Sequence, residues 1–121
     1  MHAYDPSSIA LDDLRRSIAA YHIPSDLITI QETPALTEHY DVILLCYVVN
    51  FMPCDEARTR IRDLLGCLNV GGYLCVEYFD PETAGYRADR FYPSREVMHT
   101  EIQTHGSYEL LWSEKHTSGE V

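Results

Sequence analysis

An apolar run over residues 40–49, a helical pattern and a second apolar run that begins with paired glycines at 71–72 follow one another along the chain. Apolar residues fill most of positions 40–49, which is typical of a parallel strand covered on both faces. In the next segment, up to about Asn69, apolar residues recur at helical spacing, and Asp55 is placed to cap that helix. The succession predicts a β-α-β unit, and such units build sheets that bind ligands at their strand ends.

The flanking segments carry further helical and strand patterns. One apolar face recurs in each predicted helix, and the predicted strands are short and rich in apolar or alternating residues. The predicted elements are a helix over 6–21 with Asp5 as its N-cap, strands over 27–31, 72–79 and 107–115, and a helix over 94–104 capped by Ser94. This order predicts an α/β fold with a Rossmann-like, mostly parallel sheet and flanking helices, in a single domain over residues 1–121.

Acidic residues outnumber basic ones, 19 Asp and Glu against 9 Lys and Arg, so the formal charge is −10. A nucleic-acid partner is therefore not expected, because proteins that bind nucleic acid usually present a basic face. No apolar run reaches the roughly 18 residues that a membrane-spanning helix needs, and the first residues do not resemble a signal peptide. We expect a cytoplasmic protein without membrane contact.

The four cysteines and six histidines do not form a metal-binding pattern. No two cysteines form a Cys-x-x-Cys pair, and no histidine lies at ligand spacing from another histidine or a cysteine. Cys46, Cys67 and Cys75 lie among apolar neighbours, which predicts buried thiols in a reducing compartment. No metal is expected.

Three stretches of the chain together resemble the class I S-adenosylmethionine-dependent methyltransferases. They are Tyr4–Ser8, Asp41–Pro53 and Leu68–Leu74, the last containing the paired glycines that open the fifth strand in the family. The resemblance implies a truncated version of the family's seven-stranded Rossmann-like fold. It also implies a transferase that uses S-adenosylmethionine as its cofactor, and the acidic charge of the chain favours a small molecule or a cationic partner as the methyl acceptor.

The resemblance also implies site residues. It places the cofactor against Asp5, Glu32, Cys46 and Tyr47, and the substrate against Asn50, Tyr86 and Arg90. The Asp5 carboxylate can accept two hydrogen bonds from adjacent ribose hydroxyls, and Glu32 is a loose match to the acidic residue that meets the adenine. Each residue also has a structural explanation: Asp5 as a helix cap, Asn50 as an amide that caps a turn, and the others as core, pocket-wall or loop side chains. No catalytic base is assigned.

The family's first strand and glycine-rich turn have no counterpart before Asp5, and the six glycines include no Gly-x-Gly pair. In the resembled fold that strand lies beside the strand at residues 40–49, whose apolar edge is then open for association. We therefore expect an N-terminally incomplete domain that forms a homo-oligomer or binds a partner chain, and that binds the cofactor weakly or not at all by itself. Two alternatives stay open: a non-catalytic remnant that acts as an interaction module, and a piece of a nicotinamide-dependent enzyme, although no Tyr-x-x-x-Lys pair is present.

Overall fold

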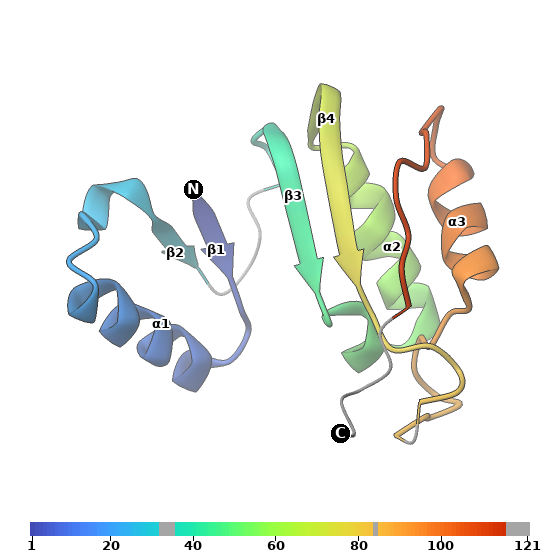
Figure 1. The fold of residues 1–121 in the computed structure, drawn as a ribbon, viewed down its shortest axis with the longest axis horizontal. Helices are drawn as coiled ribbons and strands as arrows, with labels where there is room; N and C mark the ends of the chain where they lie inside the picture. The colour runs from blue at the N-terminus through green and yellow to red at the C-terminus, as the bar shows by residue number, and fades with distance from the viewer. Residues whose placement is uncertain (32–35, 84, 116–121) are drawn as a thin grey trace. The chain divides into compact units, whose positions relative to one another are not determined.

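The structure, a computed structural model, describes residues 1–31, 36–83 and 85–115, and the chain forms two compact units. The N-terminal unit is Met1–Glu38 and the C-terminal unit is His39–Val121. The described residues form three α-helices and two separate pairs of parallel strands (Figure 1), which confirms the α/β class. Within this part of the chain, no helix combines the length and the apolar character needed to cross a membrane.

The N-terminal unit contains one helix and one pair of strands. Its elements are β1 (His2–Tyr4), α1 (Ser8–Ala20), the short 3-10 helix η1 (Ser25–Leu27) and β2 (Thr29–Gln31). β1 and β2 are parallel, and α1 lies in the connection between them. Leu11 is the one buried apolar side chain among the described residues of this unit, so its core is thin.

The start of α1 lies two residues beyond the predicted one. The Ser7 hydroxyl caps the helix by accepting a hydrogen bond from the Ala10 N–H at 3.2 Å. The Asp5 carboxylate accepts from the Ser7 N–H at 2.9 Å and so orders the turn before the helix. The prediction of Asp5 as the N-cap was wrong, because serine and aspartate fill this position about equally well and Ser7 lies at the helix start.

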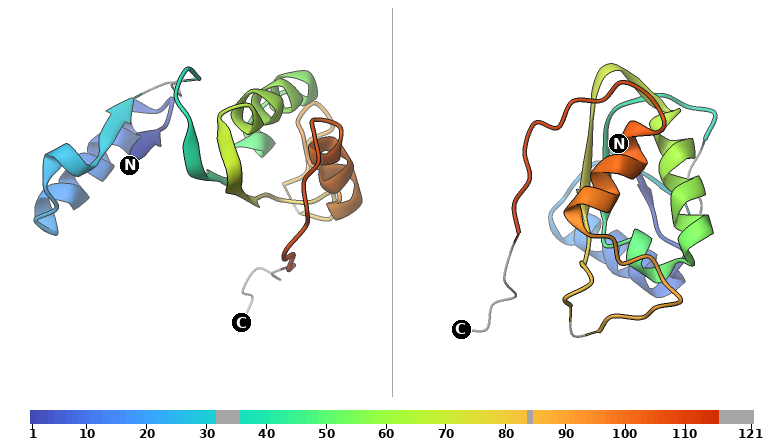
Figure 2. Two further views of the ribbon diagram at one scale, coloured as in Figure 1. Left: turned by 90° about the horizontal axis from the view of Figure 1, so that it is seen from above. Right: turned by 90° about the vertical axis from the view of Figure 1, so that its right-hand side faces the viewer.

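The C-terminal unit contains the predicted β-α-β arrangement. Its elements are β3 (Tyr40–Cys46), the 3-10 helix η2 (Val49–Phe51), α2 (Cys54–Leu65), β4 (Leu68–Glu77) and α3 (Arg95–Gln103). β3 and β4 are parallel, with α2 in the crossover between them. Figures 1 and 2 show α2 on one face of this pair, where Ile43 and Leu45 of β3 pack with Ile61 in the buried core.

The opposite face of the β3–β4 pair is exposed. Val42, Leu44 and Tyr73 keep 56%, 63% and 58% of their accessible surface, whereas Leu45 keeps 5%. The prediction of a strand covered on both faces was therefore wrong for this unit. The physical reason is that one crossover helix covers only one face of a parallel pair.

The paired glycines lie inside β4 and not at its start. Tyr40 pairs with Leu68 and Val42 with Tyr73, so residues 69–72 form a bulge on β4. Gly71 has a φ of +80°, in the left-handed region that suits glycine. The Asn69 amide closes the bulge by donating to the Asp41 carboxylate at 3.0 Å. The predicted start of this strand was thus four residues late.

The observed ends of the three α-helices agree with the predicted ends to different degrees. Ser94 caps α3, since its hydroxyl accepts from the Val97 N–H at 3.2 Å, which confirms that prediction. α2 has Pro53 as its N-cap, without a side-chain bond, and it ends at Leu65. The prediction of Asp55 as a cap was therefore wrong. Asp55 lies in the first turn, where its negative charge still interacts favourably with the helix dipole.

The predicted strand over residues 107–115 is wrong. No strand is assigned to these residues, which Figures 1 and 2 show on the β4 side of the β3–β4 pair. Lys115 lies 3.1 Å from the Asp80 carboxylate and 2.7 Å from that of Glu82, and Tyr108 packs against the core. Side-chain packing and these ion pairs hold the segment, since alternating side chains alone do not supply a strand partner.

Candidate functional site

The carboxyl ends of β3 and β4 lie side by side, with Cys46 opposite Glu77. The next residue, Tyr47, donates its N–H to the Glu77 carbonyl at 2.8 Å and has a φ of 58°. A left-handed backbone costs a residue other than glycine about 1–2 kcal/mol, and such strain is often found at functional sites. The turn stacks the Tyr47 ring on the Phe79 ring, with centroids 4.7 Å apart and planes tilted by 32°. Two aromatic rings therefore lie together at the strand ends.

Asn50 is buried behind this aromatic pair, with 2% of its surface exposed. Its amide donates to the carbonyls of Phe79 and Phe91, both at 2.9 Å, and its side-chain oxygen accepts from the Phe79 N–H at 2.8 Å. The side chain thus pairs with both backbone groups of Phe79. Both amide hydrogens are already bonded, so these contacts describe a structural role, and substrate binding by Asn50 stays a prediction.

The loop after β4 is anchored beside η2. Phe91 donates its N–H to the Met52 carbonyl at 3.1 Å, in addition to accepting from Asn50. Arg90 is thereby held next to the strand ends, with its guanidinium 3.9 Å from the Asp89 carboxylate. Tyr86 is half-exposed and packs edge-on against Tyr92, at 5.5 Å between ring centroids. The predicted acceptor-site residues therefore belong to a loop that is tied to the candidate site.

Cys46 is exposed at the end of β3, as is Cys75 on β4, whereas Cys67 is buried. The prediction of buried thiols was therefore wrong for Cys46 and Cys75 and is confirmed for Cys67. Desolvation, a hydrogen bond to the Glu77 carboxylate and the charge of that group raise the pKa of the Cys46 thiol. Cys46 is consequently a neutral thiol at pH 7, which does not favour a role as a nucleophile.

The other predicted cofactor ligands lie elsewhere. Asp5 belongs to the N-terminal unit, where it follows β1 and where its N–H donates to the Gln31 carbonyl at 3.2 Å. Glu32 lies outside the described residues. Of the predicted site residues, the structure brings Cys46, Tyr47 and Asn50 together at one place, with the loop of Arg90 beside them.

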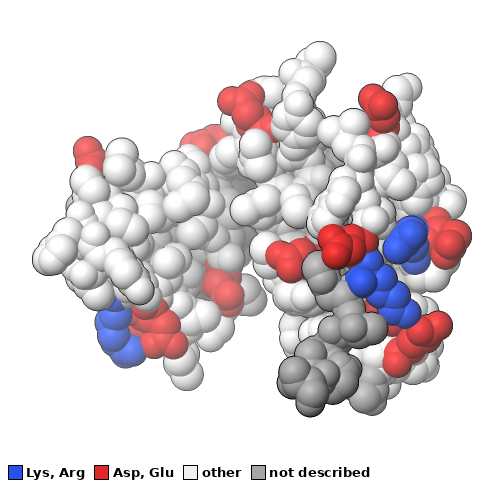
Figure 3. Space-filling view, viewed as in Figure 1, with Lys and Arg blue, Asp and Glu red and all other residues white. Residues whose placement is uncertain are grey.

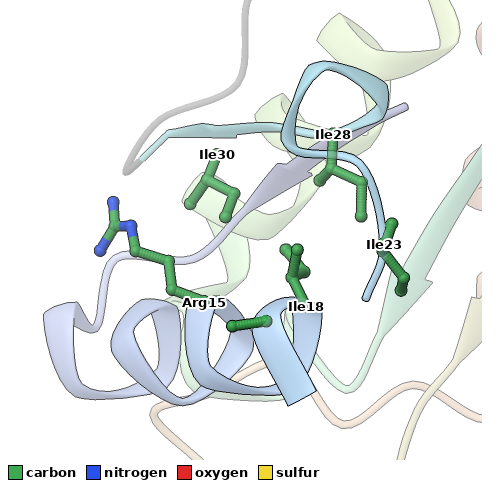
Figure 4. Close-up of a pocket in the computed structure, with 6 residues that line it drawn as sticks. Arg15, Ile18, Ile23, Ile28 and Ile30 are labelled. Carbon is green, nitrogen blue, oxygen red and sulfur yellow. The ribbon is translucent and has the colours of Figure 1, made fainter. Parts of the chain in front are cut away.

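A cavity of about 380 Å³ lies in the N-terminal unit, between α1 and the β2 side of the unit (Figure 4). Its lining is apolar apart from Arg15, whose guanidinium is paired with the Asp12 carboxylate at 2.9 Å. The lining residues are Arg15, Ile18, Ala19, Ile23, Ile28 and Ile30. None of the predicted ligands lies in it. We interpret it as a packing gap between a helix and a sheet of only two strands.

Phe79 is a residue of this site that the sequence patterns did not assign. Phe79 lies two residues beyond the end of β4, so the rule that singled out the end of β3 could have found it. A scan against models of known protein families and a search of curated proteins found no match. Among the described residues, no group of three or more His, Cys, Asp or Glu side chains could hold a metal ion.

Proposed function

We propose that this chain is a methyltransferase domain that uses S-adenosylmethionine to methylate a small molecule. The observation that supports it is the aromatic pair of Tyr47 and Phe79 at the carboxyl ends of two adjacent parallel strands. Ligands of open α/β sheets bind outside these strand ends. The resemblance of residues 41–53 to the family's methyl-transfer segment supplies the choice of cofactor.

The residues at the strand ends fit a cationic cofactor. S-adenosylmethionine, when bound, supplies an activated methyl group on a positively charged sulfur. Aromatic faces attract cations, so the rings of Tyr47 and Phe79 would hold that part of the molecule. The Glu77 carboxylate lies at the same strand ends, hydrogen-bonded to Cys46, and the chain carries a formal charge of −10, which also favours a cation.

The remaining residues of the site position the reacting groups. Transfer of a methyl group depends mainly on holding donor and acceptor in line, because little covalent help is needed. Asn50 holds the backbone of Phe79, just beyond the end of β4, and that of Phe91. These two segments would form the wall of the site. Arg90 and Tyr86, in that loop, are the candidates for contact with the acceptor.

Titration of the ¹⁵N-labelled chain with S-adenosylmethionine, followed by nuclear magnetic resonance, tests the proposal. We expect amide shifts centred on Tyr47, Asn50 and Phe79. The affinity should be weak, with a dissociation constant on the order of 1 mM, about −4 kcal/mol. The reason is that the sequence has no Gly-x-Gly turn to bring backbone amides to the cofactor.

A pair of variants separates the candidate site from unspecific binding. Tyr47→Asn removes the ring but keeps a residue that tolerates a positive φ, so it should fold and lose the amide shifts. Tyr73→Asn removes a tyrosine from the exposed sheet face and should bind like the wild type. The proposal fails if the wild-type amides of residues 46–51 and 77–80 do not shift at several times the expected dissociation constant.

A second candidate function is a non-catalytic interaction module. The observation in its favour is the exposed apolar face formed by Val42, Leu44 and Tyr73. Exposed apolar patches often mark binding surfaces. This candidate predicts no amide shifts with S-adenosylmethionine, so the same titration distinguishes the two.

A further inference from the structure

β3 has one hydrogen-bonded neighbour, β4, among the strands of the described residues. Beyond its end, the Tyr47 N–H donates to the Glu77 carbonyl, on the β4 side. Backbone groups of successive residues in a strand point to opposite edges. The N–H and carbonyl groups of Val42, Leu44 and Cys46 therefore point to the edge away from β4.

That edge lacks the usual protection against strand pairing. Proteins commonly blunt an exposed edge with lysine, proline, a bulge or a covering segment. β3 contains neither lysine nor proline, and Asp41 is its one charged residue. The bulge at residues 69–72 lies on β4, and residues 107–115 run on the β4 side of the pair (Figures 1 and 2). With no second partner among the described strands, the β3 edge is an apolar template for another strand.

We infer that β3 pairs with β3 of a second copy of this chain and forms a four-stranded sheet in the order β4-β3-β3-β4. Every copy exposes the same edge, so a two-fold symmetric interface needs only this one surface. A two-fold rotation makes the two β3 strands antiparallel. This inference does not depend on the proposed methyl transfer, because strand pairing requires no cofactor.

The distribution of charge favours this arrangement. A chain with a formal charge of −10 repels its own copies, so an interface must avoid acidic side chains. The antiparallel orientation places the two Asp41 carboxylates at opposite ends of the paired strands. Figure 3 shows largely uncharged surface over the middle of the β3–β4 pair, with acidic side chains near its ends.

The size of the paired edge sets the strength of the association. Seven residues of strand are about 23 Å long and about 10 Å thick, which gives roughly 230 Å² on each copy. A standard stable interface buries about 800 Å² on each partner. Although four strands form a more stable sheet than two, the association should therefore be weak and concentration-dependent.

Sedimentation velocity of the full chain from about 10 µM to about 1 mM, a range that covers weak dissociation constants, tests this inference. The wild type should pass from monomer to dimer as the concentration rises. Leu44→Pro removes one outward N–H without removing a bond to β4, and Leu44→Lys adds a charge to the edge strand. Each should raise the dissociation constant at least about tenfold, which is about 1.4 kcal/mol. Val70→Lys, at a fully exposed position in the bulge of β4, should dimerise like the wild type.

Several outcomes would overturn the inference. If the wild type stays monomeric over the whole concentration range, a second copy of the chain is excluded as the partner of the β3 edge. This holds even if the edge binds an added strand peptide. Dimerisation that Leu44→Lys leaves unchanged, in a protein with wild-type circular dichroism, excludes the β3 edge as the interface. If Leu44→Pro does not fold, Leu44→Lys decides the question alone.

Discussion

Asn50 holds three backbone groups with a single side chain. Its amide and carbonyl pair with both backbone groups of Phe79, and its second amide hydrogen reaches the Phe91 carbonyl. A buried donor or acceptor that loses its partner costs about 1–3 kcal/mol. The stability of the strand ends therefore depends on this residue whether or not a ligand binds there.

We expect Asn50→Ala to lower the free energy of unfolding by about 3 kcal/mol, because it leaves three backbone groups unpaired and opens a small cavity. Urea unfolding followed by circular dichroism measures the loss. Asn69→Ala is the matched control, since its exposed amide makes one bond, to the Asp41 carboxylate, and its loss should stay below about 1 kcal/mol. Equal losses in the two variants would contradict a special role for Asn50.

Cys46 offers a second test at the level of single residues. Desolvation and the Glu77 carboxylate raise its pKa, so at pH 8.5 a smaller fraction is thiolate than in the unfolded chain. Because the thiolate is the reactive form, we expect iodoacetamide to modify Cys46 more slowly in the native protein than in urea. Glu77→Gln should speed up the native reaction, and Glu96→Gln, in α3, should not. Peptide mass spectrometry of samples taken at several reaction times measures the modification of each cysteine. An unchanged rate at Cys46 in Glu77→Gln would refute Glu77 as a cause of the raised pKa.

Among the elements, β4 has the strictest backbone requirement. A Cβ atom on Gly72 would lie 2.8 Å from the Asn69 carbonyl oxygen and 2.9 Å from that of Asp41. Backbone atoms cannot move away as a side-chain end can. Gly71 has open space around it but a φ of +80°, which strains any residue with a Cβ. The bulge therefore needs both glycines, for different reasons.

We expect Gly72→Ala to destabilise the protein by about 2–3 kcal/mol, because of the overlap with backbone, and Gly71→Ala by about 1 kcal/mol, because of its φ. Gly85→Ala, where nothing lies within 4 Å, should change stability by less than about 0.5 kcal/mol. Thermal unfolding of the three variants gives the order. If Gly72→Ala were as stable as Gly85→Ala, the bulge could rearrange freely and this account of β4 would be wrong.

The helices and strands also show which parts of the fold local sequence patterns can predict. α3 was predicted within one residue at each end, because its Ser94 cap and its periodicity are local. The strand predicted over residues 107–115 failed because alternation describes one strand and not the partner it needs. The same limit applies to the candidate site. The strand-end position of Tyr47 follows from the β-α-β pattern, but the partners of Asn50 lie 29 and 41 residues away, where no local pattern indicates them.

At the level of the whole molecule, the two units differ in how much core each contains. The buried cluster of Ile43, Leu45, Val49, Ala57, Ile61, Leu64, Leu65, Cys67, Phe91 and Met98 lies wholly in the C-terminal unit. The N-terminal unit has Leu11 as its one buried apolar side chain among the residues described. Chains below about 40 residues usually need a disulfide, a metal or a partner to fold. The two units should therefore differ in independent stability.

We expect a fragment of residues 39–121 to unfold cooperatively on heating, and a fragment of residues 1–38 to show no cooperative transition. Circular dichroism of the two fragments and of the full chain measures this difference. The circular dichroism of the full chain is the reference against which the helix content of each fragment is compared. A cooperative transition in the shorter fragment would show that its thin core is sufficient.

The bonds of Asn50 also have a consequence for motion. Phe79 lies near the start of the connection between β4 and α3 and Phe91 near its end, and the Asn50 amide side chain bonds to both. Neither end of this connection can move away while that amide keeps its partners, so the two ends should open together. In hydrogen exchange, the amides of Phe79 and Phe91 should share one opening rate, and a ligand that holds either end of the connection should slow both.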